Sequence, residues 1–224
     1  MISLNNITKR YNNLTVLKNF NLSFEENEIT CIFGPSGIGK TTIANLVAKL
    51  ELFDEGNITG IENAVYSYVF QEPRLLNWYS VYDNIDFVLK DIFDFADRKK
   101  TVEYYLDMVE LTNFKNYKIN ALSGGMSQRV SLARAFAYPS NILIMDEPFK
   151  GLDIKLKQEL ICSFEKLWQK SKRTVLFITH DVEEAAYLSN TIYILKNQPA
   201  EIIKKIKKEN YQQKDEIKKE LLTI

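Results

Sequence analysis

The chain has 224 residues, of which 46% are hydrophobic and 26% are charged, and this composition predicts one globular domain with a sizeable core. Lysine plus arginine and aspartate plus glutamate both number 29, so the net charge gives no sign of a nucleic-acid-binding protein. No signal peptide is recognisable and no apolar run approaches the roughly 18 residues that span a bilayer, so we expect a protein that is soluble by itself.

Residues 2–24 predict antiparallel strands, because apolar and polar residues alternate on both sides of a turn at 11–13. Tyr11 lies at the tip of this turn. Its ring could stack on a nucleotide base or pack on its own hairpin, and the stretch alone favours neither. The apolar run Ile29–Phe33 then predicts a strand.

A glycine-rich motif follows this strand at residues 34–41, with the sequence Gly-Pro-Ser-Gly-Ile-Gly-Lys-Thr. It precedes residues 42–52, which suit a helix, and this strand–turn–helix context is the one that a phosphate-binding loop requires. Glycines let successive N–H groups converge on one oxyanion, and the helix N-terminus adds more. Because a hydrogen bond to a charged group contributes roughly 1.5–3 kcal/mol and a helix terminus about 0.3–1 kcal/mol, the amides and Lys40 should dominate phosphate binding.

The next predicted strand, 64–70, ends at Gln71, because Pro73 prevents it from continuing. Gln71 could contact a metal ion or its water, or could satisfy backbone groups of the loop. Several large apolar residues follow and could form ordinary core or a surface for a partner. These residues are Leu75, Leu76, Trp78, Tyr79 and Tyr82.

Two helical stretches are predicted next, at 81–111 and at 126–138. Asp83 and Asp97 lie near plausible starts within the first. The second is preceded by Ser123, Gly124 and Gly125, which could form a small anion site, although this feature alone is more simply a helix cap.

Two buried strands, predicted at 141–145 and 174–178, end in polar residues, where α/β sheets place ligands. Adjacent residues of a strand point to opposite sides unless the chain turns. We therefore assign Asp146 to Mg²⁺ and Glu147 to the attacking water; the simpler alternative is a cap for the next helix. His180, the only histidine, follows the second strand, and this position favours a function.

The remaining elements are a helix at 153–170 with Asp153 as its N-cap, a strand at 191–195, and a lysine-rich helical tail at 201–224. A basic amphipathic tail can lie on a membrane. We favour a helix docked on its own domain.

The joint order of these motifs resembles the ATP-binding cassette (ABC) family over residues 2–196. The segment Leu122–Gly125, between the phosphate loop and the acidic strand end, matches the family signature. The resemblance implies an α/β fold: a P-loop NTPase (RecA-like) core with a small antiparallel β lobe and an inserted α-helical lobe. We expect the nucleotide-binding domain at 1–200, with its helical lobe at about 72–138, and the tail at 201–224.

The resemblance also implies the site residues. Those expected to bind nucleotide are Tyr11, Gly34, Pro35, Ser36, Gly37, Ile38, Gly39, Lys40, Thr41, Thr42, Ser123, Gly124, Gly125 and Asp153. Those expected to bind Mg²⁺ are Thr41, Gln71 and Asp146, and those expected to act in catalysis are Lys40, Gln71, Glu147 and His180. Tyr11 matches the aromatic that stacks on adenine, Glu147 the general base and His180 the switch histidine. Ser123–Gly125 match the signature that closes on the γ-phosphate bound by the opposite monomer, and Asp153 matches a residue that couples the two sites.

The implied function is that of an ATP-hydrolysing subunit that powers solute transport through a separate permease. Residues 70–78 resemble the nitrate/sulfonate/taurine importer branch, although Asn77 stands where that branch usually has proline. The implied cofactors are ATP and Mg²⁺. The implied partners are a second copy in a head-to-tail dimer, permease subunits and an extracytoplasmic solute-binding protein, at the cytoplasmic face of the membrane.

Departures from the family are modest: Met126 replaces a commoner glutamine, Lys150 replaces a smaller residue, and the 52–64 connection is short, which suggests a trimmed β lobe. The alternative function is a soluble ABC ATPase acting on nucleic acid or ribosomes, which the single cassette and neutral charge disfavour. A small-molecule phosphotransferase would leave Ser123–Gly125 and His180 unexplained.

Overall fold

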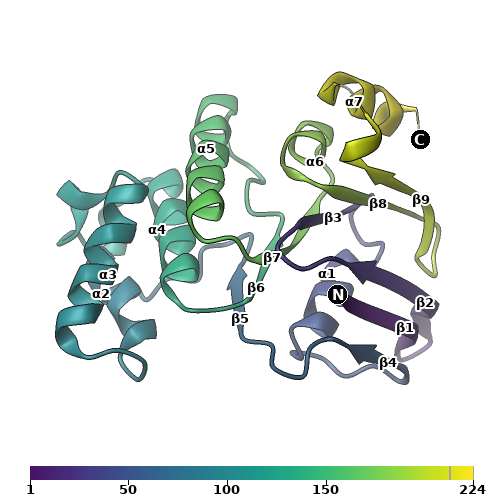
Figure 1. Cartoon of the computed structure of the whole chain (residues 1–224), viewed down its shortest axis with the longest axis horizontal. Helices are drawn as coiled ribbons and strands as arrows, with labels where there is room; N and C mark the ends of the chain where they lie inside the picture. The colour runs from purple at the N-terminus through teal and green to yellow at the C-terminus, as the bar shows by residue number, and fades with distance from the viewer. Residues whose placement is uncertain (212, 224) are drawn as a thin grey trace. The chain divides into compact units, whose positions relative to one another are not determined.

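The computed structural model describes residues 1–211 and 213–223, and the chain divides into two compact units (Figure 1). The first unit contains residues 1–66, 141–147 and the described residues from 173 onward. The second contains 67–140 and 148–172. The second unit is therefore larger than the lobe expected at about 72–138, because it also includes the segment that follows the acidic strand end.

The strands are β1 (Ile2–Tyr11), β2 (Leu14–Phe24), β3 (Ile29–Phe33), β4 (Glu55–Thr59), β5 (Tyr66–Val69), β6 (Ile142–Asp146), β7 (Thr174–Thr179), β8 (Thr191–Lys196) and β9 (Glu201–Lys207). The α-helices are α1 (Lys40–Val47), α2 (Val81–Asp86), α3 (Phe95–Met108), α4 (Gly124–Ala137), α5 (Ile154–Lys170), α6 (Val182–Leu188) and α7 (Lys214–Leu222). In the described part of the chain, no helix combines the length and the apolar character needed to cross a membrane.

The core of the first unit is a sheet in the order β6-β7-β3-β8-β9, whose first four strands run parallel. These four strands are almost entirely buried, as expected for parallel strands covered on both faces. Helix α1 packs against β6 and β7, and α6 packs against β3. The carboxyl ends of β3, β6 and β7 meet at one edge of the sheet, so the residues that follow these strands converge there.

A second, antiparallel sheet in the order β2-β1-β4 completes the first unit (Figure 1). Strand β4 lies within the short 52–64 connection, for which the sequence predicts no strand. It pairs with β1, with Leu4 opposite Ile58. The predicted combination of an α/β core, a small antiparallel lobe and a helical part is confirmed.

The expectation of a helix throughout the tail is wrong for its first residues, because Glu201–Lys207 form β9, antiparallel to β8. The buried Ile206 and the half-buried Ile202 are four residues apart, a spacing that fits both a helix and a strand. Lysines on this edge strand discourage pairing with another sheet. Helix α7 then packs on α6 with Ile217 and Leu221 buried. Residues 212 and 224 of the predicted tail lie outside the described residues.

The second unit is helical, and its long predicted helix at 81–111 is broken into α2, a 3₁₀ turn at Phe87–Leu89, and α3. The helices are capped by Ser80 and Asp94, three residues before the expected starts at Asp83 and Asp97. Asp83 instead closes a capping box with Ser80.

Helices α4 and α5 pack together, and Arg129 joins them to the end of α3. Its Nη2 donates to Oε2 of Glu159 at 2.5 Å, and its Nη1 lies 3.6 Å from Oε2 of Glu110.

Candidate nucleotide site

The turn after β3 has the backbone that its glycines allow. Gly37 and Gly39 have φ of 81° and 109°, a left-handed region that residues with a side chain rarely adopt. A Cβ on Gly39 would lie 2.6 Å from Cγ1 of Val16, and one on Gly34 would lie 2.8 Å from the carbonyl oxygen of Leu195. Gly34 and Gly39 are therefore required by close packing as well, whereas Gly37 is required by its conformation.

The tip of this turn is open to solution. Pro35, Ser36 and Gly37 are exposed, whereas Ile38 is buried and anchors the turn in the core. The backbone N–H groups of Ser36 and Gly37 are thus accessible to an anion, and the buried isoleucine holds them in place. This is the arrangement that a phosphate cradle requires.

Lys40 begins α1 and is buried, with 4% of its surface exposed. Its Nζ donates to the carbonyl oxygens of Gly34 and Pro35, each at 2.8 Å, and lies 3.7 Å from Oε1 of Glu147. A buried ammonium group must be paired in this way. The turn therefore encloses the buried ammonium group of Lys40.

Glu147 is buried at the end of β6 with φ of 46°, so the chain turns immediately after Asp146. The chain therefore makes the turn that is the exception to alternation, and the separate roles of the two carboxylates stay a prediction. The backbone N–H of Glu147 donates to the carbonyl of Ile178 at 3.0 Å. Its Oε1 lies 3.3 Å from Nδ1 of His180. The turn thus brings one carboxylate between Lys40 and His180.

Asp146 faces the start of α1 instead. Its Oδ2 accepts a hydrogen bond from Oγ1 of Thr41 at 2.9 Å. Hydroxyl and carboxylate oxygens are the metal ligands that Mg²⁺ prefers. The ion is usually bound by one or two protein ligands together with phosphate oxygens. The residues present therefore fit the ion.

Tyr11 is the last residue of β1, next to α1. Its hydroxyl contacts Glu51 and lies 3.5 Å from Oγ1 of Thr42. Burial, and then the hydrogen bond with Glu51, raise the pKa of Tyr11. Nζ of Lys9 lies 4.8 Å from its ring centroid. The hydroxyl is thus held in place, and stacking of the ring on adenine stays a prediction.

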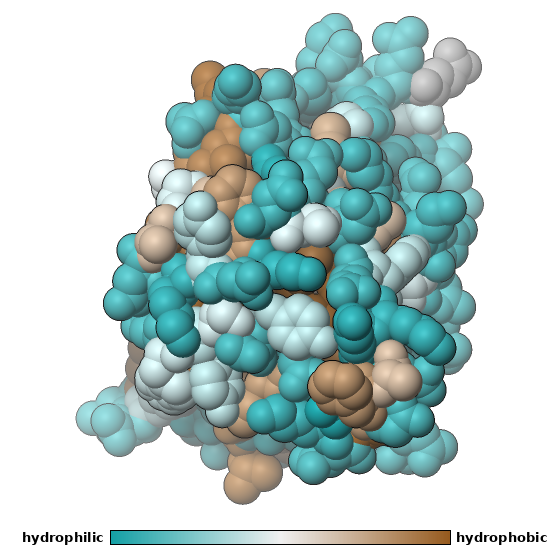
Figure 2. All heavy atoms as spheres, turned by 90° about the vertical axis from the view of Figure 1, so that its left-hand side faces the viewer, coloured by the Kyte–Doolittle hydropathy of each residue, from teal (hydrophilic) through white to brown (hydrophobic). Residues whose placement is uncertain are grey.

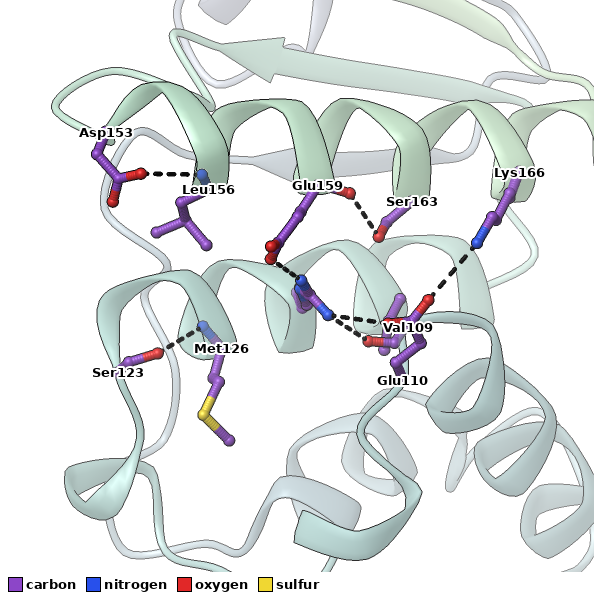
Figure 3. Close-up of polar contacts among 10 residues, drawn as sticks. Val109, Glu110, Ser123, Met126, Asp153, Leu156, Glu159, Ser163 and Lys166 are labelled. Atoms are coloured by element: carbon purple, nitrogen blue, oxygen red, sulfur yellow. Dashed lines mark hydrogen bonds and ion pairs between the residues drawn. The ribbon is translucent and has the colours of Figure 1, made fainter.

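The remaining predicted residues lie in the second unit, where Ser123 and Asp153 begin two neighbouring helices (Figure 3). Oγ of Ser123 accepts from the backbone N–H of Met126 at 3.3 Å, and Oδ1 of Asp153 accepts from that of Leu156 at 3.0 Å. Both side chains are helix caps. Ser123 and Gly124 are exposed, so the start of α4 is accessible to a ligand.

Gly125 has a packing role that the motif did not reveal. A Cβ at this position would lie 2.2 Å from Cδ1 of Leu156 in α5. The second glycine of the signature therefore permits the close approach of the two helices that carry Ser123 and Asp153.

Gln71 is exposed in the bend after β5, and α4 holds this bend. The buried Gln128 donates through Nε2 to the carbonyls of Phe70 and Pro148. Arg134 donates to the carbonyls of Pro73 and Arg74, both at 3.1 Å. The role of Gln128 was not predicted, although a polar side chain on the buried face of a predicted helix is a usable signal.

The first unit thus brings together the phosphate turn, Lys40, Thr41, the carboxylates of Asp146 and Glu147, and His180. The sequence profile of the ABC transporter family matches residues 17–150. The chain belongs to the ABC transporter family.

Relatives of this ABC protein are found among import ATP-binding proteins. The aliphatic sulfonates import ATP-binding protein SsuB of Bacillus cereus is 36% identical over 217 residues, which cover 92% of this chain and 85% of the relative. The nitrate import ATP-binding protein NrtD of Synechocystis sp. is 40% identical over 197 residues, or 84% and 74% of the two chains. The spermidine/putrescine import ATP-binding protein PotA of Clostridium acetobutylicum is 37% identical over 206 residues, but this chain covers only 58% of it.

Solved ABC cassettes share the fold. The dimeric structure of a post-hydrolysis state of the cassette MJ0796, bound to ADP and Pi, has a TM-score of 0.79 at 30% identity and covers 93% of this chain and 99% of its own. A further dimeric structure of MJ0796, a bacterial ABC transporter cassette, has a TM-score of 0.80 at 31% identity, with the same coverage of both chains. The chain is thus an ATP-binding and ATP-hydrolysing cassette of the transporter type, and the nucleic-acid alternative finds no support.

Proposed function

We propose that this ABC protein powers an importer of the nitrate/sulfonate/taurine type through separate permease subunits at the cytoplasmic face of the membrane. The observation that carries the catalytic part is the convergence of Lys40 and His180 on the carboxylate of Glu147, beside an open phosphate turn. The names of the sulfonate and nitrate relatives support import and this solute class, and an extracytoplasmic solute-binding protein would complete such a system.

In this proposal the exposed amides of the turn and Lys40 bind the phosphates of ATP, and Glu147 accepts a proton from the attacking water. His180 then lies where it can contact both the carboxylate and the terminal phosphate. Thr41, Asp146 and Gln71 would hold Mg²⁺, which when bound neutralises charge on the β- and γ-phosphates. Tyr11 would stack on the base.

The signature is proposed to act on a second copy of the chain. Ser123 and Gly124 are exposed at the start of α4, where N–H groups and a hydroxyl suit an anion. Asp153 caps the helix that packs on α4 and would link the two sites. The dimeric structures of related cassettes support a pair of copies, and the proposed pair is head-to-tail with two ATP molecules at its interface.

We further propose that the permease docks on aromatic side chains of the second unit. Trp78 is 69% exposed and Phe87 48% exposed, and Tyr79 contacts both rings. On the face drawn in Figure 2, pale and brown side chains lie among hydrophilic ones, which suits a reversible contact. Trp78→Ala should abolish co-purification with the permease and leave basal ATP hydrolysis unchanged; intact assembly would place the docking surface elsewhere.

The catalytic proposal is tested by measuring Mg²⁺-dependent ATP hydrolysis and ATP binding in the same preparations. Glu147→Gln should lower kcat by roughly 10²–10⁴, the usual effect of a positioned general base, and should still bind ATP. Lys40→Ala should lose hydrolysis and bind ATP weakly. Lys18→Ala, which removes an exposed lysine of β2, is the control and should behave as the wild type. Loss of ATP binding in Glu147→Gln, or normal activity in Lys40→Ala, would refute the assigned roles.

A further inference from the structure

A buried carboxylate, that of Glu184, contacts the residue that precedes His180. Glu184 in α6 and Thr179 at the end of β7 are each only 2% exposed. Oγ1 of Thr179 donates to Oε2 of Glu184 at 2.6 Å. The same hydroxyl oxygen accepts a hydrogen bond from the backbone N–H of Asp181 at 3.0 Å. The residues on both sides of His180 are therefore tied to one buried acid.

This arrangement differs from an ordinary helix cap. Asp181 is the N-cap of α6 and accepts from the N–H of Glu184 at 3.1 Å, which is one half of a capping box. In the usual box the glutamate would reach back to the N–H of the N-cap residue itself. Here the hydroxyl of Thr179 bridges the carboxylate of Glu184 and the backbone N–H of Asp181. The helix cap is therefore connected to the last residue of the central strand.

The position of the acid also argues for more than capping. Burial of a carboxylate is costly unless its partners are well placed, and an exposed glutamate would satisfy a helix start equally well. The neighbouring Glu183 is such a residue: it is largely exposed and pairs with Lys218 at 2.6 Å. The buried Glu184 instead fixes the peptide units that flank His180, whose Nδ1 lies 3.3 Å from Glu147.

We propose that Glu184 is a positioning residue for His180 and acts through the hydroxyl of Thr179. The strand end and the helix start are held at fixed separation, so the imidazole stays within reach of Glu147 and of the terminal phosphate. This inference rests on the proposed role of His180 in hydrolysis. It assigns Glu184 no contact with ATP.

The first test compares two substitutions at Thr179. Thr179→Val keeps the shape but removes the hydroxyl, and Thr179→Ser keeps the hydroxyl. Because a displacement of about 1 Å at a catalytic group can cost roughly 10²-fold, we expect kcat for ATP hydrolysis to fall about 10- to 100-fold in Thr179→Val and to stay within about threefold in Thr179→Ser. KM for ATP should be unchanged in both.

The second test removes the acid in two backgrounds. Glu184→Leu should lower kcat in the otherwise native protein but add little in a His180→Ala background, because residues that act as a unit are not additive. Glu184→Gln, whose amide oxygen can still accept from Thr179, should retain most of the rate. Glu183→Leu, on the same helix, is the matched control and should keep full activity.

These outcomes separate the inference from the proposed function. If His180→Ala hydrolyses ATP at the normal rate, the role of His180 fails. If His180→Ala is slow but Thr179→Val is as fast as Thr179→Ser, or if Glu184→Leu lowers kcat equally in both backgrounds, only the positioning role of Glu184 is overturned. Should Glu184→Leu not fold, the Thr179 pair decides.

Discussion

Glu147 carries the buried carboxylate of the site on a backbone conformation that residues with a side chain rarely adopt. Its φ of 46° is left-handed, which costs a residue with a side chain roughly 1–2 kcal/mol. The conformation directs the carboxylate toward Lys40 and His180 instead of across the strand. Strain of this kind persists when the surroundings determine the conformation, and it is concentrated at functional sites.

This strain predicts a difference between two inactive variants. Glu147→Ala and Glu147→Gly both lose the carboxylate, and both should lose roughly 10²–10⁴ in kcat. Only glycine relieves the left-handed backbone, so Glu147→Gly should be more stable than Glu147→Ala by about 1 kcal/mol in urea unfolding. If Glu147→Ala were instead the more stable variant, as the smaller loss of backbone entropy of alanine predicts for an unstrained position, the turn would carry no strain.

At this scale the sequence motifs identify the residues that converge in the first unit. Lys40, Thr41, Asp146, Glu147 and His180 can all be found from their places after strands. The support of His180 by Glu184 cannot, because it depends on a hydrogen bond through Thr179 that no sequence spacing requires.

At the scale of elements, helices α4 and α5 are predicted by the sequence, but the way they pack together is not. Both helices exist, but their close contact depends on the absence of a Cβ atom at Gly125. Nothing lies within 4 Å of a Cβ built on Gly124, whereas one built on Gly125 meets Leu156 at 2.2 Å. The two adjacent glycines of the signature thus have different structural roles.

The difference predicts opposite effects of the same substitution on stability. Gly125→Ala should destabilise the protein by about 1–3 kcal/mol, because overpacking moves side chains or backbone. Gly124→Ala, the matched control, should be neutral or stabilising, since alanine is the better helix former by up to about 1 kcal/mol. Leu156→Ala should restore part of the loss in Gly125→Ala. The measurement is thermal or urea unfolding, and equal effects at both glycines would contradict the packing role.

The elements that differ from the sequence-based expectation do so for identifiable reasons. The pattern of strand β9 also fits a helix, because Ile202 and Ile206 are spaced for either period. Strand β4 is difficult to predict from the sequence, because Glu55–Thr59 is short and largely exposed. The strand is formed by its pairing with β1. The starts of α2 and α3 are ambiguous because an acidic residue is common both at a cap and three residues after it.

At the scale of the whole molecule, the predicted site residues are divided between the two units. The first unit holds the phosphate turn, both strand-end carboxylates and His180, and the second holds Gln71, the signature and Asp153. The order of the sequence motifs indicates the family but not this division, because the second unit combines segments before and after the acidic strand.

A complete site is expected to form only when two copies of the chain associate. Glu147→Gln should bind ATP without hydrolysing it, so Mg²⁺–ATP should shift this variant from monomer to dimer in sedimentation experiments over a range of protein concentrations. In the native protein the rate per molecule should rise with concentration if, as proposed, the dimer is the active species.

Ser123→Arg tests which surface joins the copies. The residue is exposed at the start of α4, so a long cation there should block the dimer of Glu147→Gln while leaving ATP binding in the first unit intact. Asn116→Arg, exposed in the same unit, is the matched control and should still dimerise. A Glu147→Gln protein that stays monomeric with ATP bound, or a dimer that tolerates Ser123→Arg, would exclude the signature as the contact between copies.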